Sequence, residues 1–289
     1  MSAVIRILSD LHLGHDSCVI RRVEDLAPLL EGISTLLING DGSEQLARRF
    51  IDRGLKMRNE LVAICQERGI ELIEHRGNHD PHVPGPPYRW FSEGSVLVHH
   101  GDAVYPRVSP WSREVWRHRK TIAKFVEANW RDDFTMDERF DFAKALELDV
   151  PQIPHPKTKN KILRAVKLLA WPPHRPLLVL GIWANAGRRI SGWGMEFAPA
   201  AQLIICGHFH RTNHHRAGDG RWVMMTGPFA SLGRPSCVDL DEAEGMATLR
   251  DVQEDSTGKW APAEARLTLK KSPDGQQWQE LRADSALDD

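Results

Sequence analysis

The stretch Val4-Ile5-Arg6-Ile7-Leu8-Ser9-Asp10-Leu11-His12 joins a short apolar run directly to an Asp-x-His pair. The apolar run over residues 4–8 predicts a short buried strand. Because side chains two residues apart along a strand point the same way, Asp10 and His12 can present two metal ligands toward one point. A buried strand that ends in such groups recurs along the chain, and this recurrence decides the fold.

Further predicted strands, at about residues 35–38, 72–73, 96–98 and 203–206, also end in groups that can bind a metal. These groups are Asp41, Asn78 with His79, His100, and His208 with His210. In open α/β sheets, binding sites form outside the carboxyl ends of the strands. The sequence therefore predicts one shared site. Its mixture of Asp, Asn and His donors suits Mn, Fe, Zn or Co better than it suits a thiolate-bound metal.

The segments between the strands predict an α/β layered fold in which helices flank the sheets. Helices are expected at about residues 19–30 and from Ser43, a favoured N-cap residue, to Gly69. Residues from about 103 to 200 are rich in Trp, Arg and Lys and indicate a helical insertion. We therefore expect a main domain over residues 1–253, which contains this insertion, and a polar C-terminal tail over residues 254–289.

Each motif is weak by itself, because an Asp-x-His pair, a Gly-Asn-His-Asp turn or a Gly-His-x-His sequence also occurs among ordinary surface residues. Their occurrence together, in order and each at the end of a predicted strand, favours a functional site. Over about residues 1–250, interrupted by the insertion, the set resembles the calcineurin-like metallophosphoesterase superfamily. The motifs that carry the resemblance are Ser9-Asp10-Leu11-His12, Asn39-Gly40-Asp41, Gly77-Asn78-His79-Asp80, His100-Gly101-Asp102 and Gly207-His208-Phe209-His210.

The resemblance implies a sandwich of two mixed β-sheets flanked by helices. It also implies a pair of divalent metal ions, with Mn as the expected metal and Fe, Zn or Co as alternatives. Asp10, His12 and His210 would hold one ion, Asn78, His100 and His208 would hold the other, and Asp41 would bridge the two.

Two metal ions ~3.5–4 Å apart polarise phosphoryl oxygens and lower the pKa of a bridging water, so that hydroxide attacks phosphorus at neutral pH. The expected protein is therefore a metal-dependent phosphoesterase that hydrolyses a phosphate ester or pyrophosphate bond. The resemblance places His79 beside the leaving oxygen, where a protonated imidazole donates a proton. Many relatives carry Asp three residues after the bridging Asp, where this chain has Glu44. Glu44 either orients His79 or is an ordinary acidic residue in the first turn of a helix.

Two adjacent histidines compete for one ligand position. His100 is favoured because it directly precedes Gly101-Asp102, as the corresponding ligand does in the family. His99 would then point to the opposite face of its strand.

The insertion is expected to determine the choice of substrate, a small-molecule or lipid-linked phosphoester. Arg113 and Arg117 lie on one predicted helix, with Trp111 and Trp116 interleaved. They either contact the substrate phosphate from a lid, or form a solvated basic face whose Trp residues only pack. Arg188 likewise either binds a phosphate or caps the end of a helix.

Two other functions compete with a general phosphoesterase. The His-Gly-Asp motif and the Trp-rich insertion favour a relative of the UDP-diacylglucosamine pyrophosphohydrolases of lipid A synthesis. Against this, that family usually has Arg where this chain has His79. The other alternative is a non-catalytic scaffold, like the retromer subunit that keeps this fold. Such scaffolds tend to lose ligands or the catalytic histidine, and this chain retains both.

The composition limits the partners and the compartment. The formal net charge is −1, with Lys+Arg 38 against Asp+Glu 39, so no general field attracts nucleic acid, and a nuclease is disfavoured. The cysteines are scattered, which suits free thiols in a reducing cytoplasm. We recognise no leader peptide and no apolar run near the ~20 residues needed to span a bilayer, so a cytoplasmic location is expected. The sequence does not indicate an oligomeric state.

Overall fold

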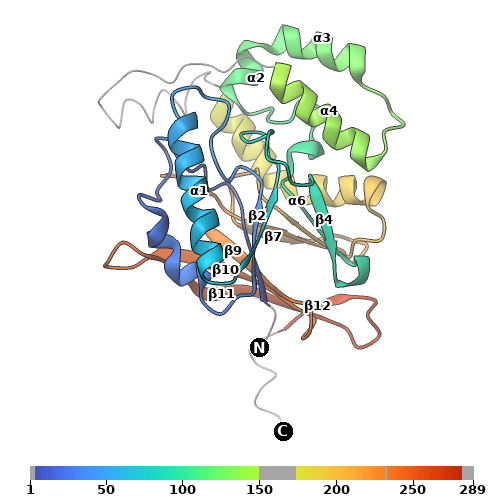
Figure 1. Ribbon diagram of the computed structural model, residues 1–289. Coiled ribbons are helices and arrows are strands. Elements are labelled where there is room, and N and C mark those ends of the chain that lie inside the picture. Colours follow the sequence, from blue (N-terminus) through green and yellow to red (C-terminus); the bar gives the residue numbers. More distant parts are fainter. Residues whose placement is uncertain (1–3, 150–173, 232, 282–289) are drawn as a thin grey trace.

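The computed structural model describes residues 4–149, 174–231 and 233–281. These residues form two mixed β-sheets packed face to face, with helices on their outer sides (Figure 1). The strand order is β12-β11-β10-β9-β1-β2-β3 in the first sheet and β4-β5-β6-β8-β7 in the second. The predicted α/β layered sandwich of two mixed sheets is confirmed.

The first sheet combines a parallel part, β1-β2-β3, with an antiparallel part. Ile7 of β1 lies opposite Leu37 of β2 on one side and Val238 of β9 on the other. The strands are β1 (Val4–Leu8), β2 (Thr35–Asn39), β3 (Glu71–His75), β9 (Ser236–Asp241), β10 (Met246–Glu254), β11 (Trp260–Lys271) and β12 (Trp278–Glu280). The parallel strands end at one edge, where their following loops meet.

The second sheet has a parallel centre, β5-β6-β8, with an antiparallel strand at each edge. Its strands are β4 (Tyr88–Phe91), β5 (Val96–His99), β6 (Leu203–Cys206), β7 (Asn213–Arg216) and β8 (Trp222–Met225). β5 and β6 are neighbours although a long segment of chain separates them. The helical insertion therefore leaves the sheet and returns to it beside its starting point.

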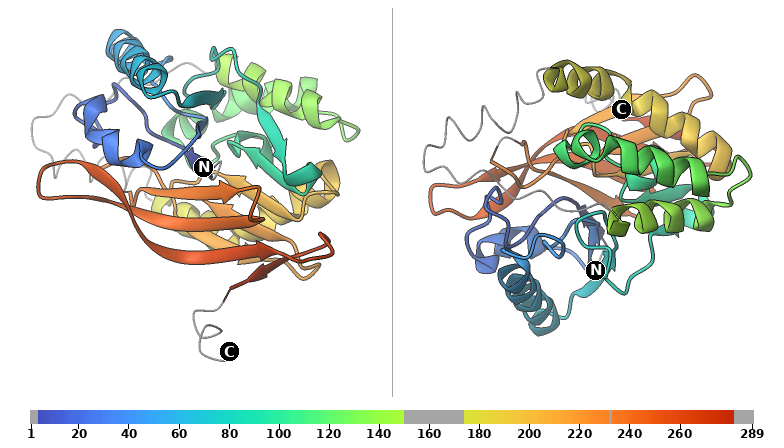
Figure 2. Two further views of the ribbon diagram at one scale, coloured as in Figure 1. Left: turned by 60° about the horizontal axis from the view of Figure 1, so that its bottom comes forward. Right: turned by 90° about the horizontal axis from the view of Figure 1, so that it is seen from above.

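The α-helices are α1 (Ile51–Glu67), α2 (Arg113–Arg117), α3 (Arg119–Asn129), α4 (Met136–Asp149) and α6 (Arg175–Phe197). Short 3₁₀ helices occur at η1 (Val23–Leu30), η2 (Ser92–Gly94) and η3 (Asp102–Val104). Two views show the first sheet facing η1 and α1, and the second sheet facing the helices between β5 and β6 (Figure 2). No helix in the described ranges is long and apolar enough to span a membrane.

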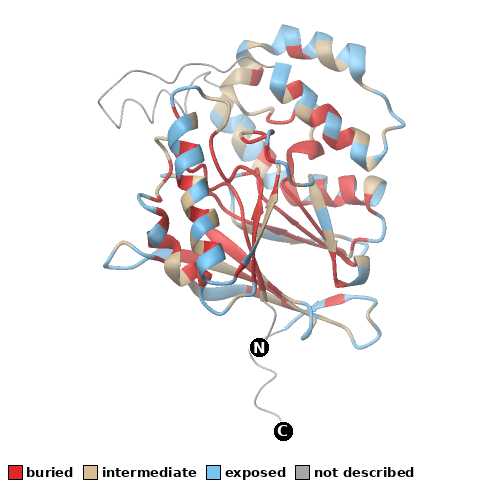
Figure 3. Cartoon of the chain, viewed as in Figure 1, coloured by how far each residue is buried: buried red, intermediate tan, exposed pale blue. Residues whose placement is uncertain are grey.

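Alternating side chains explain why both faces of each sheet are covered. Along β6, Leu203 and Ile205 face the other sheet, whereas Ile204 and Cys206 face the helices. All of these side chains are buried, as are most strand residues in Figure 3. Strands buried on both faces read as continuous apolar runs, which is why the sequence revealed them clearly.

The helices between β5 and β6 lie where the helical insertion was expected, although residues 150–173 of that prediction lie outside the described residues. Phe140 and Leu146 of α4 pack in one cluster with Leu97 of β5 and Ile190 of α6. The described part of the insertion therefore shares the hydrophobic core of the second sheet.

Two expectations about element boundaries are wrong. Ser43 does not begin a helix, because α1 starts at Ile51. The backbone N–H of Ser43 donates to Asp80, and that of Gln45 donates to the carbonyl of His79, so this segment is tied to another loop. The polar tail from residue 254 is also wrong for residues 254–281, because β11 and β12 extend the first sheet.

Candidate metal centre

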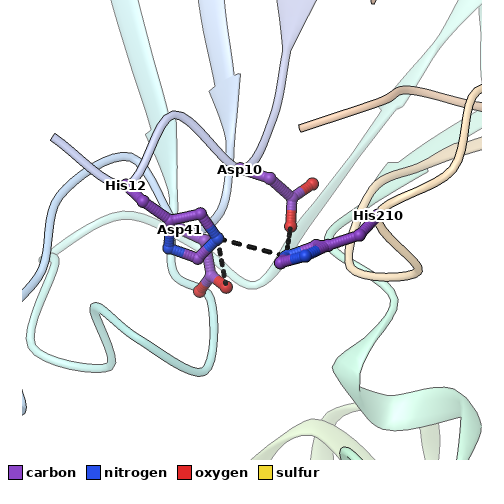
Figure 4. Close-up of side chains that lie close together, drawn as sticks. All are labelled: Asp10, His12, Asp41 and His210. Carbon is purple, nitrogen blue, oxygen red and sulfur yellow. Dashed lines mark hydrogen bonds and ion pairs between the residues drawn. The ribbon is translucent and has the colours of Figure 1, made fainter. Parts of the chain in front are cut away.

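The candidate ligands lie in loops that directly follow β1, β2, β3, β5 and β6. These loops meet at one edge of the sandwich, as the order of polar groups along the sequence predicts. Figure 4 shows side chains from three of them, those of Asp10, His12, Asp41 and His210, pointing toward one another. All but His210 are buried. The sheet edge therefore concentrates carboxylates and imidazoles that are far apart in sequence.

Most of these residues have a left-handed backbone. The φ angles are 54° at Asp10, 46° at His12, 53° at Asp41, 67° at His208 and 53° at His210. Such conformations cost about 1–3 kcal/mol each outside glycine and concentrate at functional sites. The expectation that Asp10 and His12 point the same way because they continue a strand is therefore wrong, since both lie in a loop after β1. Both side chains still reach the same cluster.

The first group of donors consists of Asp10, His12, Asp41 and His210, with one ligand atom of each lying within 4.8 Å of all the others. His210 Nε2 lies 3.2 Å from Asp10 Oδ1 and 3.1 Å from His12 Nε2. His12 Nε2 lies 3.9 Å from Asp41 Oδ2. Two imidazole nitrogens and two carboxylate oxygens thus surround one point.

A second group of donors also approaches Asp41. His100 Nε2 lies 3.4 Å from Asp41 Oδ2 and 3.2 Å from Asn78 Oδ1. The rings of His100 and His208 are 5.0 Å apart. Gly40 permits this approach, because it has a φ of 79° and any Cβ there would overlap the His100 ring. Asp41 Oδ2 therefore faces both groups of donors.

The hydrogen bonds around His100 provide a test of whether a cation fits. Its Nδ1 donates to the carbonyl of Asn39 at 2.9 Å, so in the neutral ring Nε2 carries a lone pair. That lone pair faces two further acceptors, the oxygens of Asn78 and Asp41. Three acceptors at this spacing need a positive charge between them. A proton on Nε2 supplies it in the free side chain, because burial lowers the pKa of His100 but Asp41 raises it to about 10, and a metal ion would take the place of that proton. The donor set therefore fits a metal ion, and the backbone contact is the kind that orients a ligating histidine.

The protonation states of His12, His208 and Asp41 also suit ligands. Burial, with a contribution from the nearby His79, lowers the pKa of His12 to about 4. Burial likewise lowers the pKa of His208 to about 3, with a contribution from His100. Burial alone would raise the pKa of Asp41, but the histidines around it, His100 first, hold it well below its usual value. Neutral imidazoles and an ionised carboxylate are the forms that bind metals.

Glu44 and His79 are adjacent in space. His79 Nδ1 lies 2.9 Å from Glu44 Oε2, and the His79 ring is 4.8 Å from the His12 ring. Burial by itself lowers the pKa of His79, but the carboxylates of Glu44 and Asp41 raise it well above its usual value. His79 is thus half-buried beside the first group of donors, with one nitrogen held by a carboxylate. His12, Glu44 and His79 also satisfy the spacing of a metal-binding triad.

His99 lies apart from the centre. Its ring stacks on Trp193 at 4.7 Å and contacts Phe140 at 5.8 Å, between β5, α4 and α6. The structure therefore brings His100 to the cluster of donors and places its neighbour in the core.

Asp80 belongs to the Gly77-Asn78-His79-Asp80 motif, but the sequence indicated no role for its side chain. Its Oδ1 accepts the backbone N–H of Asp41 at 3.0 Å and of Gly77 at 2.8 Å. Its Oδ2 accepts those of Gly42 at 2.7 Å and Ser43 at 3.3 Å. One buried carboxylate thus fixes the loop of the bridging Asp41 against the loop of Asn78.

Glu147 on α4 was also missed. It follows Phe140 and Ala143 at helical spacing on the side of α4 that faces the sheet. Burial is the main reason why the pKa of Glu147 rises to about 8, and its charge interacts with those of His79 and Asp41. The helical spacing of residues 140, 143 and 147 could have revealed Glu147, because it places a carboxylate on the side of the helix where apolar residues are expected.

The expected substrate contacts are dispersed. Arg113 and Arg117 lie on α2, which begins just after Trp111, whose ring is 4.9 Å from that of His208. Arg188 is exposed on the outward side of α6. Its neighbour Arg189 lies over the ring of Tyr105 at 5.8 Å. Among the described aromatic residues of the insertion, Trp111 places its ring beside a candidate ligand.

A family model described as calcineurin-like phosphoesterase matches residues 3–212. The chain belongs to this family. This bears out the resemblance carried by the five motifs at the ends of the strands.

Comparisons with individual proteins are more distant. No curated protein matches the chain. A single mutant of Vps29 from Entamoeba histolytica is 12% identical with a TM-score of 0.43, covering 90% of this chain and 99% of that chain. Vps29 from Chaetomium thermophilum is 14% identical with a TM-score of 0.42, covering 92% and 96%. A dimetal phosphatase from Danio rerio is 13% identical with a TM-score of 0.42, covering 86% and 96%. Likenesses this weak carry no argument about activity.

Proposed function

We propose that this protein is a dinuclear metal-dependent phosphoric ester hydrolase that cleaves a phosphate ester or pyrophosphate bond. The observation that carries the proposal is the arrangement of two groups of Asp, Asn and His donors around Asp41. We propose Mn as the metal, with Fe, Zn or Co as alternatives that the same donors accept. Ions bound there would polarise phosphoryl oxygens and make a water molecule acidic enough to attack phosphorus at neutral pH.

In this proposal His79 protonates the leaving oxygen. Glu44 engages Nδ1, which leaves Nε2 as the nitrogen that can donate to the substrate. Glu44 itself is fixed, because its other oxygen accepts the backbone N–H groups of Leu46 and Ala47. The imidazole therefore needs little reorientation before proton transfer, and the negative charge of Glu44 stabilises its protonated form.

A narrower candidate is a diester or pyrophosphate with organic groups on both sides, including lipid-linked nucleotides like those of the UDP-diacylglucosamine pyrophosphohydrolases. The observation that favours it is an aromatic and cationic wall beside His208, formed by Trp111, Tyr105 and Arg189. This wall lies at the second group of donors, whereas His79 lies at the first. A monoester carries only one organic substituent and would leave one of the two sides without a contact.

The cysteines bear on the compartment. Cys18, Cys65, Cys206 and Cys237 are all free and buried. Free thiols support a cytoplasmic location, which we propose together with a small-molecule or lipid-linked substrate.

The test is a hydrolysis screen of the Mn-loaded protein against phosphomonoesters, phosphodiesters and nucleotide-diphosphate lipids, combined with metal analysis. We expect about two ions per chain, as in other two-metal sites, and turnover of at least one ester class. A wild-type protein that binds no metal under Mn or Zn loading would refute the proposal. Full metal loading without turnover of any ester would instead favour a non-catalytic scaffold.

A further inference from the structure

The first turns of α6 expose large apolar side chains. Leu177 is 74% exposed, Leu180 is 57% exposed and Leu178 is 39% exposed. Figure 2 (right) shows the beginning of α6 at the periphery of the molecule. Isolated exposed leucines are ordinary on protein surfaces, but a contiguous group in one helical turn indicates an interaction surface.

Helical periodicity defines one continuous face. Leu177, Leu180, Gly181, Ala184 and Arg188 recur on the outward side of α6, and all are exposed. The opposite side carries Ile182, Ala186 and Ile190, which are buried against the second sheet. The outward face from Leu177 to Arg188 is therefore not needed for packing on the sheet.

The surroundings of this face are positively charged. The sequence from Arg175 to Met195 contains no Asp or Glu. Beside it, the residues of α2 and the start of α3 include four cations and one acidic residue: Arg113, Arg117, Arg119 and Lys120, with Glu114.

Contacts join α6 to α2 and α3. Arg175 donates to the carbonyl of Trp111 at 2.7 Å, and the ring of His174 lies 6.4 Å from that of Trp116. Arg119 in turn lies 5.4 Å from the centre of the Trp116 ring. These contacts place the first turn of α6, where the exposed leucines begin, beside α2 and the start of α3.

We propose that the outward face of α6, with the basic side chains of α2 and α3 beside it, docks onto the surface of an anionic lipid bilayer. Leucines on a helix lying at the interface enter the boundary of the acyl chains, and Arg and Lys bind lipid phosphates. A second copy of the chain fits this surface poorly, because a two-fold interface would bring cations against cations.

The same helix reaches the metal centre. Trp183 of α6 donates from Nε1 to the carbonyl of Phe209, which lies between the candidate ligands His208 and His210. Docking through α6 would therefore hold the centre close to lipid head groups. The proposal itself does not depend on hydrolysis, because it concerns binding to a surface.

The experiment is co-sedimentation of the whole protein with vesicles of phosphatidylcholine alone or mixed with phosphatidylglycerol. We expect binding to the mixed vesicles that weakens as salt is raised, and little binding to neutral ones. Leu177→Gln/Leu180→Gln should lower the partition by roughly tenfold or more, because the buried methylenes are lost. Arg119→Glu/Lys120→Glu should remove the preference for anionic vesicles.

Two controls separate the face from a general effect of polarity. Leu281→Gln changes a 43% exposed residue just after β12, and Leu55→Gln changes a 39% exposed residue on α1. Both should bind vesicles like the wild type. All variants should keep their circular dichroism and their metal content.

Four results would overturn the proposal. The first is a wild-type protein that does not sediment with anionic vesicles, and the second is a leucine variant that binds them as well as the wild type does. The third is a lower free energy of unfolding in the leucine variant, which would show that these leucines pack within the chain. The fourth is a dimer in light scattering that this variant dissociates, which would assign the face to a second copy instead.

Discussion

Glu44 uses its two carboxylate oxygens for different partners. Oε2 lies 2.9 Å from His79 Nδ1, whereas Oε1 accepts the backbone N–H groups of Leu46 at 3.1 Å and Ala47 at 3.0 Å. The structure places Glu44 beside His79, whereas the other interpretation from sequence, an acidic residue in the first turn of a helix, is wrong because α1 begins only at Ile51. The extra methylene relative to Asp lets one side chain span both partners.

Replacing His79 tests the proposed proton donor. His79→Ala should keep the fold and the metals, because the ligands that we assign are intact. Turnover should fall by roughly 10²–10⁴, the usual span for losing a general acid. The loss should be smaller for nitrophenyl esters, because a stable leaving oxygen needs no proton. Measuring kcat on good and poor leaving groups together with metal content checks this. Loss of metal would instead make His79 a ligand, as the His12-Glu44-His79 triad allows.

Glu44→Gln should show a weaker form of the same pattern. Gln keeps an oxygen for the backbone of Leu46 and Ala47 but removes the charge that stabilises protonated His79. Glu44→Asp keeps the charge but shortens the side chain, so it should be unable to serve both partners. Rates on a poor leaving group, with His79→Ala as background, distinguish these cases. Equal effects of Glu44→Gln in both backgrounds would show that Glu44 does not act through His79.

Asp41 offers the sharpest test of a shared centre. Its Oδ2 lies 3.9 Å from His12 Nε2 and 3.4 Å from His100 Nε2. Asp41→Asn should therefore lose both ions, whereas His12→Ala should lose mainly one. Metal analysis of purified protein after loading and dialysis provides the measurement. Retention of one ion by Asp41→Asn would mean that the carboxylate is not shared.

The fold and the candidate ligands could be predicted from the sequence because both depend on local patterns. Continuous apolar runs such as Leu203–Cys206 identify strands buried on both faces, and the residue after each run lies at a sheet edge. The geometry of the sheets then brings Asp10, Asp41 and His100 together without further information.

Contacts across the fold could not be predicted in this way. Asp80 is recognisable as part of a turn, but only the folded chain shows that it accepts N–H groups from the loop of Asp41. Glu147 is one of many carboxylates on helices, and Arg188 is an arginine on a face that only packing defines as outward. Roles like these depend on which elements meet, and no local pattern specifies that.

The hydrogen bonds that Asp80 accepts from the backbone should support both the stability of the fold and metal binding. Asp80→Asn retains one acceptor oxygen but points an amide group at backbone N–H donors of Gly42 or Gly77. We expect a loss of about 1–3 kcal/mol in the free energy of unfolding, the usual cost of unsatisfied buried groups. Metal affinity should fall as well, because Asp41 is less well fixed. Urea unfolding and metal titration measure the two effects.

A matched control for Asp80 is Asp141, whose ion pair with Arg76 is 2.7 Å long and whose side chain is 71% exposed. An exposed pair contributes about 0–1 kcal/mol, so Asp141→Asn should change little. If both variants lost equal stability, the backbone contacts of Asp80 would not be the cause.

The C-terminal strands show how composition misleads. β11 alternates exposed charges, such as Glu264 and Arg266, with buried Leu267 and Leu269. Averaged over a window, this segment is polar and resembles a loose tail, although its period of two predicts a strand with one buried face. The antiparallel pairing with β10, including Leu249 opposite Leu267, supplies the partner that makes the pattern stable.

Leu269 tests whether this segment belongs to the core. It is 0% exposed and lies in the cluster between the two sheets. Leu269→Ala should lower the free energy of unfolding by about 2–5 kcal/mol, because it removes buried methylenes and leaves a cavity between the sheets. Glu264→Ala, on the exposed part of the same strand, should change the free energy of unfolding by no more than about 0.5 kcal/mol. Urea unfolding of both variants gives the comparison. Equal stability of Leu269→Ala and the wild type would mean that this part of the chain is a loosely held tail, as its composition suggests. A selective loss at Leu269 would instead show that the strands beyond residue 254 stabilise the sandwich whose edge carries the metal ligands.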